Sequence, residues 1–364
     1  MILKLVFENL KHRPLRTGLS VFLIGIPVTL MLTLVGLSQG MLADSARRAR
    51  GVGADIAVRP PGTSLISLST APMSQKLLDK LRAEPHVTLA TGTMVHPVAA
   101  VTMVTGVDLD EFNKMSGGFK FIGGGPFQGP EDVILDEFYA RQRGVKAGGT
   151  IEMLNRKWRV CGVAEPGKLA RIVLPLATLQ DLTGNSGKLS QIFLKVDSPA
   201  NVETVIASLR AQLEGYPIYS MEEFTSLISV NNLPELRTFI QVMTVVSVII
   251  GFAVVFLSMY TAVLQRTREI GILKSLGASQ SYVLLIILIE ALLLSLAGSF
   301  AGIGLSYGSR WLMMKLIPAS LTQAIVPEWW PIAGFIAMTG AVLGALYPAF
   351  SAARQDPIEA LAYE

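Results

Sequence analysis

The stretch QRTREIGILKSLGASQ, residues 265–280, is a charged island between two long apolar runs. The run before it, residues 238–264, has no charged residue, and the run after it, residues 281–308, has only Glu290. A charged side chain at the middle of a bilayer costs about 2.5–3.5 kcal/mol on insertion scales, so the island cannot lie inside a membrane. The pattern predicts a short connection between two membrane-spanning helices.

The composition of the whole chain is also typical of a membrane protein. Of its 364 residues, 51% are hydrophobic and only 16% are charged, whereas soluble domains carry about 25% charged residues. The net charge is a small +4 with no dense basic patch, which argues against a nucleic-acid partner. The single cysteine, Cys161, excludes an intrachain disulfide and a cysteine metal cluster, and we expect it to be buried in a strand.

Two further apolar runs bring the number of expected membrane helices to four. The first, residues 17–43, spans about 40 Å as a helix and is too long for the apolar core of a signal peptide. The second, residues 329–352, opens with Trp329 and Trp330, aromatic residues that favour membrane interfaces. We therefore expect a membrane protein with four transmembrane α-helices, one before a long gap and three after it.

The sequence between the first and second apolar runs, residues 44–237, predicts a mixed α/β domain. Residues 54–60 and 86–107 are rich in strand-forming side chains, and residues 74–85 between them have helical apolar spacing. The segment GTIEMLNRKWRVCGV, residues 149–163, predicts a hairpin around its Asn-Arg-Lys, and residues 190–224 predict strand, helix and strand. We expect two βαβ units flanking a β-rich insert.

The distribution of Lys and Arg near the helix ends predicts the orientation in the membrane. Eight such residues fall on one side and six on the other, and the short N-terminal flank holds four of the eight: Lys4, Lys11, Arg13 and Arg16. We expect both termini and the island to be cytoplasmic. Residues 1–16 are then an amphipathic helix on the inner leaflet and residues 353–364 a cytoplasmic tail, while residues 44–237 and the loop 309–328 are extracytoplasmic.

The island itself has the pattern of a short amphipathic helix. Ile270, Leu273, Leu276 and Gly277 fall on one helical stripe. Arg266 and Glu269 are spaced to pair at i, i+3, and Gly277 suits a helix stop. An exposed apolar stripe needs a cover, which is either lipid head groups or the groove of a partner protein.

Several segments together resemble one known family. RTREIGILKSLGAS, residues 266–279, resembles the coupling-helix signature of FtsX/MacB/LolC-type permeases of ABC transporters. IEALLLSLAGSFAGIGL, residues 289–305, resembles their third membrane helix, and YPAFSAARQDPIEALAYE, residues 347–364, resembles their C-terminal ending. GADIAVRPPG, residues 53–62, and residues 149–167 resemble parts of their extracytoplasmic domain. The resemblance covers essentially the whole chain.

This resemblance implies a type VII, mechanotransmission ABC permease in the cytoplasmic (inner) membrane of a bacterium. Residues 44–237 would be a MacB-like periplasmic core domain and residues 238–364 an FtsX-like permease domain. A separate ABC ATPase subunit would drive export of a lipid, lipoprotein, peptide or drug-like substrate. The other implied partners are a second permease copy or paralogue, a periplasmic adaptor with an outer-membrane channel, and membrane lipid.

The family's motif also implies which residues contact the ATPase and leaves a second function open. Carried over residue by residue, the expected contact set is Glu269, Ile270, Gly271, Ile272, Leu273, Lys274, Leu276 and Gly277. The alternative function is an FtsX-like signalling subunit that activates an extracytoplasmic partner, such as a cell-wall hydrolase, without transport.

The chain is not expected to be an enzyme. GVAEPGKL, residues 162–169, matches the glycine and lysine spacing of a P-loop. However, Leu169 stands where a Ser or Thr would hold magnesium, and Pro166 interrupts the segment. We therefore predict no catalytic, cofactor-binding or metal-binding residue here, with ATP and magnesium held by the partner ATPase.

The membrane runs contain one carboxylate and several glycines of interest. Glu290 is either a proton or substrate site or a structural hydrogen-bonding residue, and the structural role is favoured because the family's third helix commonly carries Glu there. Small residues four apart let helices pack closely. They predict packing positions at Gly298, Gly302, Gly304, Gly308, Gly340 and Gly344.

Overall fold

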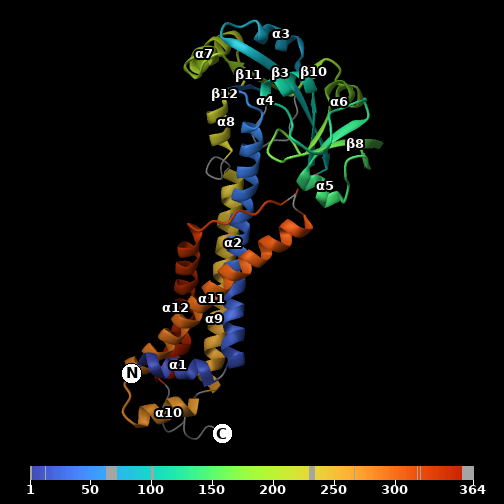
Figure 1. The fold of residues 1–364 in the computed structure, drawn as a ribbon. Coiled ribbons are helices and arrows are strands. Elements are labelled where there is room, and N and C mark those ends of the chain that lie inside the picture. The colour runs from blue at the N-terminus through green and yellow to red at the C-terminus, as the bar shows by residue number, and fades with distance from the viewer. Residues whose placement is uncertain are drawn as a thin grey trace. The chain divides into compact units, whose positions relative to one another are not determined.

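The computed structural model describes residues 2–12, 14–62, 72–99, 102–228, 234–265, 267–317, 319 and 321–354. The chain forms two compact units (Figure 1). Residues 1–38, 235–312 and 323–364 make a unit that we call the helical unit. Residues 39–234 and 313–322 make a unit that we call the strand unit. The strand unit thus begins at residue 39, five residues before the expected domain boundary.

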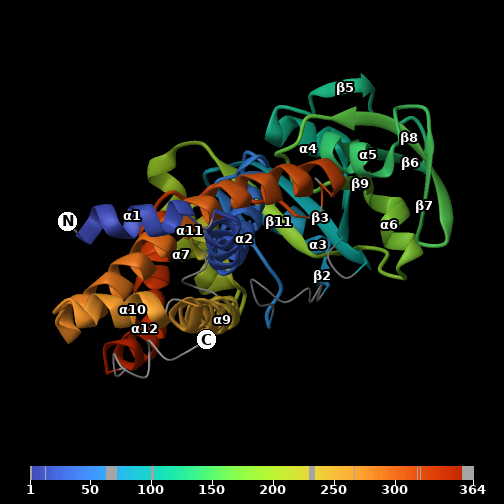
Figure 2. The ribbon, with the colours of Figure 1, turned by 90° about the horizontal axis from the view of Figure 1, so that it is seen from below.

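Four helices are long and apolar enough to cross a membrane, as expected. They are α2 (Pro14–Arg50), α9 (Pro234–Gln265), α11 (Gln280–Leu316) and α12 (Trp329–Arg354). Two short helices accompany them, α1 (Ile2–His12) and α10 (Thr267–Ser275). Figure 2 looks nearly along α2 and α9 and shows α10 beside α12.

Two of the long helices continue past the ends of their apolar runs. α2 runs beyond residue 43 to Arg50, and α11 runs to Leu316 through the first part of the expected loop 309–328. Hydropathy shows where an apolar run stops, but a helix stops only where its backbone pattern breaks. Residues 44–50 and 309–316 are rich in the good helix formers Ala, Arg, Leu, Met and Lys, so both helices continue.

Close helix packing in the helical unit uses three of the six predicted glycines. A Cβ on Gly298 would lie 2.7 Å from Ile24 of α2, and one on Gly302 would lie 2.7 Å from Val28. A Cβ on Gly344 of α12 would lie 2.9 Å from the Phe252 carbonyl oxygen of α9. Added Cβ atoms on Gly304, Gly308 and Gly340 would meet no atom of the described chain within 4 Å, so a packing role for these three stays a prediction.

The strand unit is built on a ten-stranded sheet of order β12-β1-β11-β3-β4-β9-β6-β8-β5, with β7 paired to β8. The first strand–helix–strand segment is β1 (Ile56–Val58), α3 (Lys76–Arg82) and β3 (Val87–Ala99). The second is β11 (Gln191–Val196), α7 (Val202–Gln212) and β12 (Ile218–Ser220). β1 pairs antiparallel with both β11 and β12, so the two segments interleave as a split βαβ arrangement and do not stand side by side.

The insert between these segments extends the same sheet. Its strands are β4 (Thr102–Val107), β5 (Phe121–Gly124), β6 (Asp132–Asp136), β7 (Thr150–Met153), β8 (Arg156–Ala164) and β9 (Ile172–Pro175). Its helices are α4 (Leu109–Ser116), α5 (Glu137–Arg143) and α6 (Leu176–Leu182). A separate two-stranded ladder joins β2 (Met73–Ser74) to β10 (Lys188–Leu189), and a 3-10 turn, η1 (Pro199–Asn201), and the helix α8 (Met221–Leu227) complete the unit.

Two strand predictions gain detail from the structure. The strand-forming run 86–107 contains two strands, β3 and β4, which fold back on each other as an antiparallel pair. The hairpin of β7 and β8 turns at Leu154 and Asn155, both with positive φ, and Arg156 already belongs to β8. A two-residue turn with both central residues at positive φ matches the right-handed twist of the strands, which explains the shift toward the N-terminus.

The sheet has two differently covered faces. Ile56, Ile192 and Leu194 lie on one face and pack against α3 and α7 in a buried apolar cluster. Ala57 and Phe193 lie on the opposite face, in a cluster with Phe112 of α4 and Phe224 of α8. Successive residues of a strand point to opposite faces, so β1 and β11 each contribute to both clusters.

Candidate functional site

The charged island forms α10, a helix of nine residues between α9 and α11. It is shorter than the expected range 265–280. The helix ends at Ser275, and Gly277 just beyond it has a φ of +94°, a left-handed conformation that suits glycine. The amide of Ala278 donates to the carbonyl oxygen of Leu273 and that of Gly277 to Lys274, both at 3.0 Å, and these bonds satisfy the last turn. Arg266 and its expected pairing with Glu269 lie outside the described residues.

One face of α10 packs on its own chain. Ile270 and Gly271 are buried, and Ile270 joins the apolar cluster formed by α2, α9, α11 and α12. Leu273 is half-buried and lines a small cavity with Met259 of α9 and Ile287 of α11. The predicted apolar stripe is therefore only partly exposed. Ile270 and Leu273 face the other helices of the helical unit, whereas Leu276 does not.

Lys274 also faces its own chain. Its Nζ donates a hydrogen bond to the carbonyl oxygen of Ala353, 2.9 Å away in the last turn of α12. Carbonyl oxygens at a helix C-terminus are unsatisfied and carry partial negative charge, so an ammonium group there is favourable. This bond ties α10 to α12 as well as to its chain neighbours α9 and α11.

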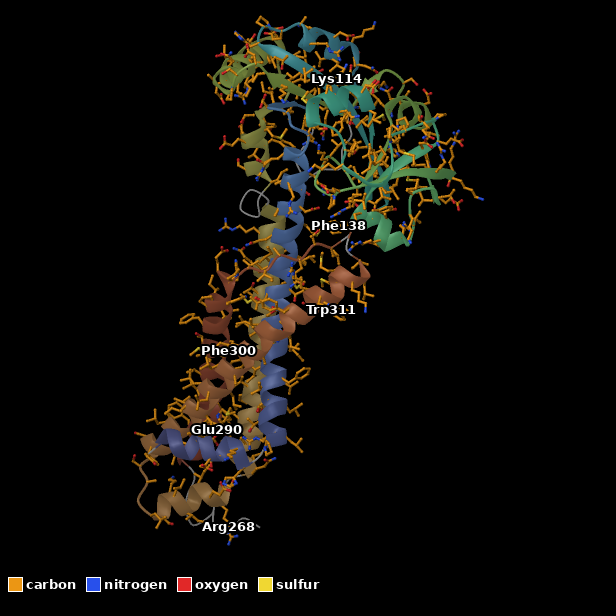
Figure 3. All side chains as sticks on the ribbon, viewed as in Figure 1. Lys114, Phe138, Arg268, Glu290, Phe300 and Trp311 are labelled. Atoms are coloured by element: carbon orange, nitrogen blue, oxygen red, sulfur yellow. The ribbon has the colours of Figure 1, made fainter. Side chains whose placement is uncertain are left out.

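The other face of α10 is exposed and partly apolar. Leu276 is 80% exposed and Ile272 is 45% exposed, and these two residues are four apart on the helix. Arg268 and Glu269 are exposed beside them, and in Figure 3 Arg268 lies on the side of α10 that is turned away from Glu290. Of the eight predicted contact residues, the exposed ones are Glu269, Ile272, Leu276 and Gly277.

Glu290 is buried between helices, with only 3% of its surface exposed. Its Oε1 lies 3.5 Å from Nη2 of Arg16, which belongs to α2. The pair links α11 to the N-terminal part of α2 across 274 residues of sequence. This contact supports the structural role for Glu290. Sequence reasoning did not identify Arg16 as its partner, because nothing local in either segment indicates which distant side chain will be adjacent.

The segment 162–169, which matched the P-loop spacing, has a different geometry. The Lys168 Nζ donates to the carbonyl oxygen of Ser116 at 2.6 Å and to that of Gly118. Burial lowers the pKa of the Lys168 ammonium, and nearby Lys120 lowers it further. The next regular element is the strand β9, whereas a P-loop leads into a helix whose N-terminus faces the phosphates.

Comparison with family models covers most of the chain in two parts. Residues 17–212 match the MacB-like periplasmic core domain, and residues 242–357 match the FtsX-like permease C-terminal domain. These matches agree with the resemblance found in the sequence motifs.

Comparison with individual proteins gives relatives of the same kind. An uncharacterized ABC transporter permease, YknZ, from Bacillus subtilis is 31% identical over 60% of this chain and 55% of that protein. The macrolide export ATP-binding/permease protein MacB of Escherichia coli K12 is 32% identical over 64% of this chain and 38% of that protein. The chain thus spans about half or less of these relatives' length. The crystal structure of the periplasmic region of MacB from Actinobacillus actinomycetemcomitans aligns with 49% of this chain and 94% of that region, at 16% identity and a TM-score of 0.38.

Proposed function

Because the chain belongs to the family of MacB-like and FtsX-like ABC transporter permeases, we propose that it is a permease subunit driven by a separate ATPase subunit. ATP binding and hydrolysis in that partner would move the strand unit and thereby export a substrate. The proposed substrate class is broad: a lipid, lipoprotein, peptide or drug-like molecule. The match of residues 17–212 to the MacB-like core domain supports transport over the FtsX-like signalling role.

The observation that carries this proposal is the exposed apolar pair Ile272 and Leu276 on α10. Two apolar side chains four apart on a short helix are the usual anchors for a groove on a partner protein. Charged Arg268 and Glu269 beside them would form the polar rim of such a contact. Because Lys274 ties α10 to α12, a force applied to α10 would reach the last membrane helix directly.

The proposal places ATP and magnesium in the partner. Lys168, the lysine of the P-loop-like segment, is already bonded to two backbone carbonyl oxygens. Leu169, which follows it, has no hydroxyl for a magnesium ion. A preparation of this chain free of any ATPase subunit should hydrolyse no ATP above the background.

The proposed arrangement has both termini and α10 in the cytoplasm, with the strand unit outside the inner membrane. The Lys and Arg distribution of the N-terminal flank supports this orientation. A second permease copy or paralogue would complete the membrane assembly, and an extracytoplasmic adaptor would receive the substrate.

The experiment that tests the ATPase contact is co-purification of the chain with its cognate ATPase subunit in detergent. Leu276→Asp would place a charge without a partner in the contact, at a cost of about 2–5 kcal/mol or roughly a 30- to 4000-fold loss of binding. The permease itself should remain folded, because Leu276 contacts so little of its own chain. Arg268→Gln, on the rim, should cost less than about 1 kcal/mol.

A third variant separates loss of binding from loss of folding. Ile270→Asp puts a charge into the permease's own apolar cluster, so it should destabilise the permease before any ATPase is added. If the Leu276→Asp protein retains the ATPase as well as the parent does, the exposed pair faces lipid and the ATPase contact lies elsewhere.

A further inference from the structure

The strand unit contains a cavity of about 380 Å³ on the face of the sheet that α3 and α7 do not cover. Its walls come from the end of α2, the strands β3, β4 and β11, and α8. Much of the lining is apolar: Met41, Val95, Met103, Phe193, Phe224 and Ile228. Pockets for small molecules typically measure about 300–1,000 Å³ and are mostly apolar with a few polar groups, so this cavity has the size and character of a ligand site.

Three members of a buried network of four charges line this cavity, namely Asp44, Arg48 and Arg171, and the fourth member is Asp136. Arg171 donates to Asp44 at 2.8 Å and to Asp136 at 2.9 Å. Arg48 lies 3.3 Å from Asp44. The network therefore contains two guanidinium groups and two carboxylates, and its formal charges balance without any ligand. Burial raises the pKa of Asp136, and the two arginines oppose that shift.

Three polar side chains on the cavity wall have hydrogen-bonding capacity that the described chain does not use. Arg48 lines the cavity, and its Nε is buried and makes no hydrogen bond, although the Asp44 carboxylate lies 3.3 Å away. Gln191 and Thr105 line the cavity, and no hydrogen bond of either side chain to the described residues is found. Buried polar groups in proteins are nearly always satisfied, so donors gathered around a cavity indicate a ligand or ordered water.

We propose that this cavity binds an uncharged amphiphile, with an apolar body against the apolar wall and hydroxyl or ester oxygens that accept hydrogen bonds from Arg48, Gln191 and Thr105. The balanced network decides the charge of the ligand. A charged ligand loses its hydration when it enters a buried site, and this desolvation costs free energy. Because the charges of this site already cancel, no unpaired opposite charge is present to offset that cost. An uncharged head group avoids this cost and still accepts hydrogen bonds from the polar side chains on the cavity wall.

The test uses the full chain in lipid nanodiscs and needs no ATPase, so its failure would leave the proposed ATPase coupling untouched. The probe is a 12-carbon monoacylglycerol with a photoreactive diazirine at the end of its chain. After irradiation, mass spectrometry should locate adducts on peptides that contain Met103 or Phe224. Supplying the probe in the bilayer or from an aqueous carrier distinguishes a membrane lipid from a soluble ligand, and labelling by either route supports the site.

Competition with three unlabelled 12-carbon amphiphiles tests the charge argument. Monolaurin should compete at least roughly tenfold better than anionic laurate or cationic dodecyltrimethylammonium, a ratio that corresponds to one decade in affinity. If either ionic amphiphile competes as well as monolaurin, the proposed ligand class is wrong. Adducts confined to the membrane helices would show that the cavity holds water only.

Two neighbouring arginines on α2 provide a matched pair of variants. Arg48→Met removes a guanidinium group from the cavity wall and should lower cavity labelling roughly tenfold. Arg47→Met, at an exposed position outside the cavity lining, should leave it unchanged. Thr105→Val nearly preserves side-chain shape and loses no described hydrogen bond, so it should fold and still reduce labelling several-fold. Equal labelling of Arg48→Met, Thr105→Val and the parent would overturn the proposal.

Discussion

Arg171, just before β9, donates a hydrogen bond from Nη2 to Oδ2 of Asp44 on α2, at 2.8 Å. The same guanidinium donates from Nη1 to Asp136, which also caps α5 by accepting from the amide of Tyr139. The side chains of Asp44 and Arg171 are only 6% and 11% exposed. The final turns of α2 are thus bound to the sheet by a buried ionic contact.

We expect Asp44→Ala to destabilise the strand unit strongly. After the substitution, Asp136 is the one carboxylate of the network that remains for the guanidinium groups of Arg48 and Arg171. Removing one partner of a buried ion pair typically lowers the free energy of unfolding by about 3–5 kcal/mol. Thermal unfolding of the purified chain, followed by tryptophan fluorescence, measures the change. Asp79→Ala is the control, because Asp79 is 79% exposed and lies 3.9 Å from Arg82, so it should cost less than about 1 kcal/mol. Equal melting of the two variants would show that the network contributes little.

The Asp44–Arg171 contact also shows which features a sequence can predict. The four long helices were predictable because each is a continuous apolar run, and the strands because β-branched residues cluster between turn signals. Two residues 127 apart carry no local sign that they will meet. The same limit applies to the interleaving of β1 between β11 and β12, which depends on pairings distant in sequence.

The candidate site on α10 also has one feature that the sequence could predict and one that it could not. The stop at Gly277 was predictable, since it depends on the local need for a left-handed residue. The exposed face was not, because it is decided by how α9, α11 and α12 pack around Ile270. Helical periodicity places Ile270 and Leu273 on one stripe, but it cannot show that their own chain covers that stripe.

Two glycines of α11 should respond oppositely to the same substitution. A Cβ at Gly302 would lie 2.7 Å from Val28 and 2.8 Å from the backbone oxygen of Gly25, so α2 and α11 would have to separate. We expect Gly302→Ala to cost about 1–3 kcal/mol, in the range of overpacked cores. Gly304→Ala meets open space and should be neutral or stabilising by up to about 1 kcal/mol. Melting temperatures in detergent would compare them, and a stable Gly302→Ala protein would contradict the close packing.

A double-mutant cycle should show that Glu290 and Arg16 stabilise each other. Glu290→Leu or Arg16→Met alone removes one partner of a buried ion pair, which typically costs about 3–5 kcal/mol. Both changes together leave two apolar side chains and should recover much of that loss, giving a coupling energy of at least about 1 kcal/mol. The yield of folded protein after heating in detergent measures each variant. Losses that simply add would separate the two residues and reopen a proton or substrate role for Glu290.

Cys161 should be unreactive in the folded protein. Burial raises the pKa of its thiol to about 11, with a further increase from Asp132, from an ordinary value of 9.0. At pH 8 the thiolate is therefore scarcer in the folded than in the unfolded chain, and iodoacetamide should label Cys161 only after denaturation. Since the raised value belongs to the folded state, stability should be unaffected below about pH 9 and should fall between about pH 9 and 11. Rapid labelling of the native protein at pH 8 would contradict this account.

Two exposed serines on different units test the proposed orientation in the membrane. Ser186 lies in the strand unit and Ser275 on α10, and both are exposed. In a Cys161→Ser background, Ser186→Cys should react with a membrane-impermeant maleimide added to spheroplasts, because the strand unit is proposed to be extracytoplasmic. Ser275→Cys should react only after the inner face is opened, and the permease should be expressed without its ATPase so that α10 is not covered. The physical basis is the four cationic residues that flank the first helix at its N-terminal side, which favour retention in the cytoplasm. The reverse labelling pattern would place α10 outside the cell, where no ATPase could reach it, and would overturn the coupling proposal together with the orientation.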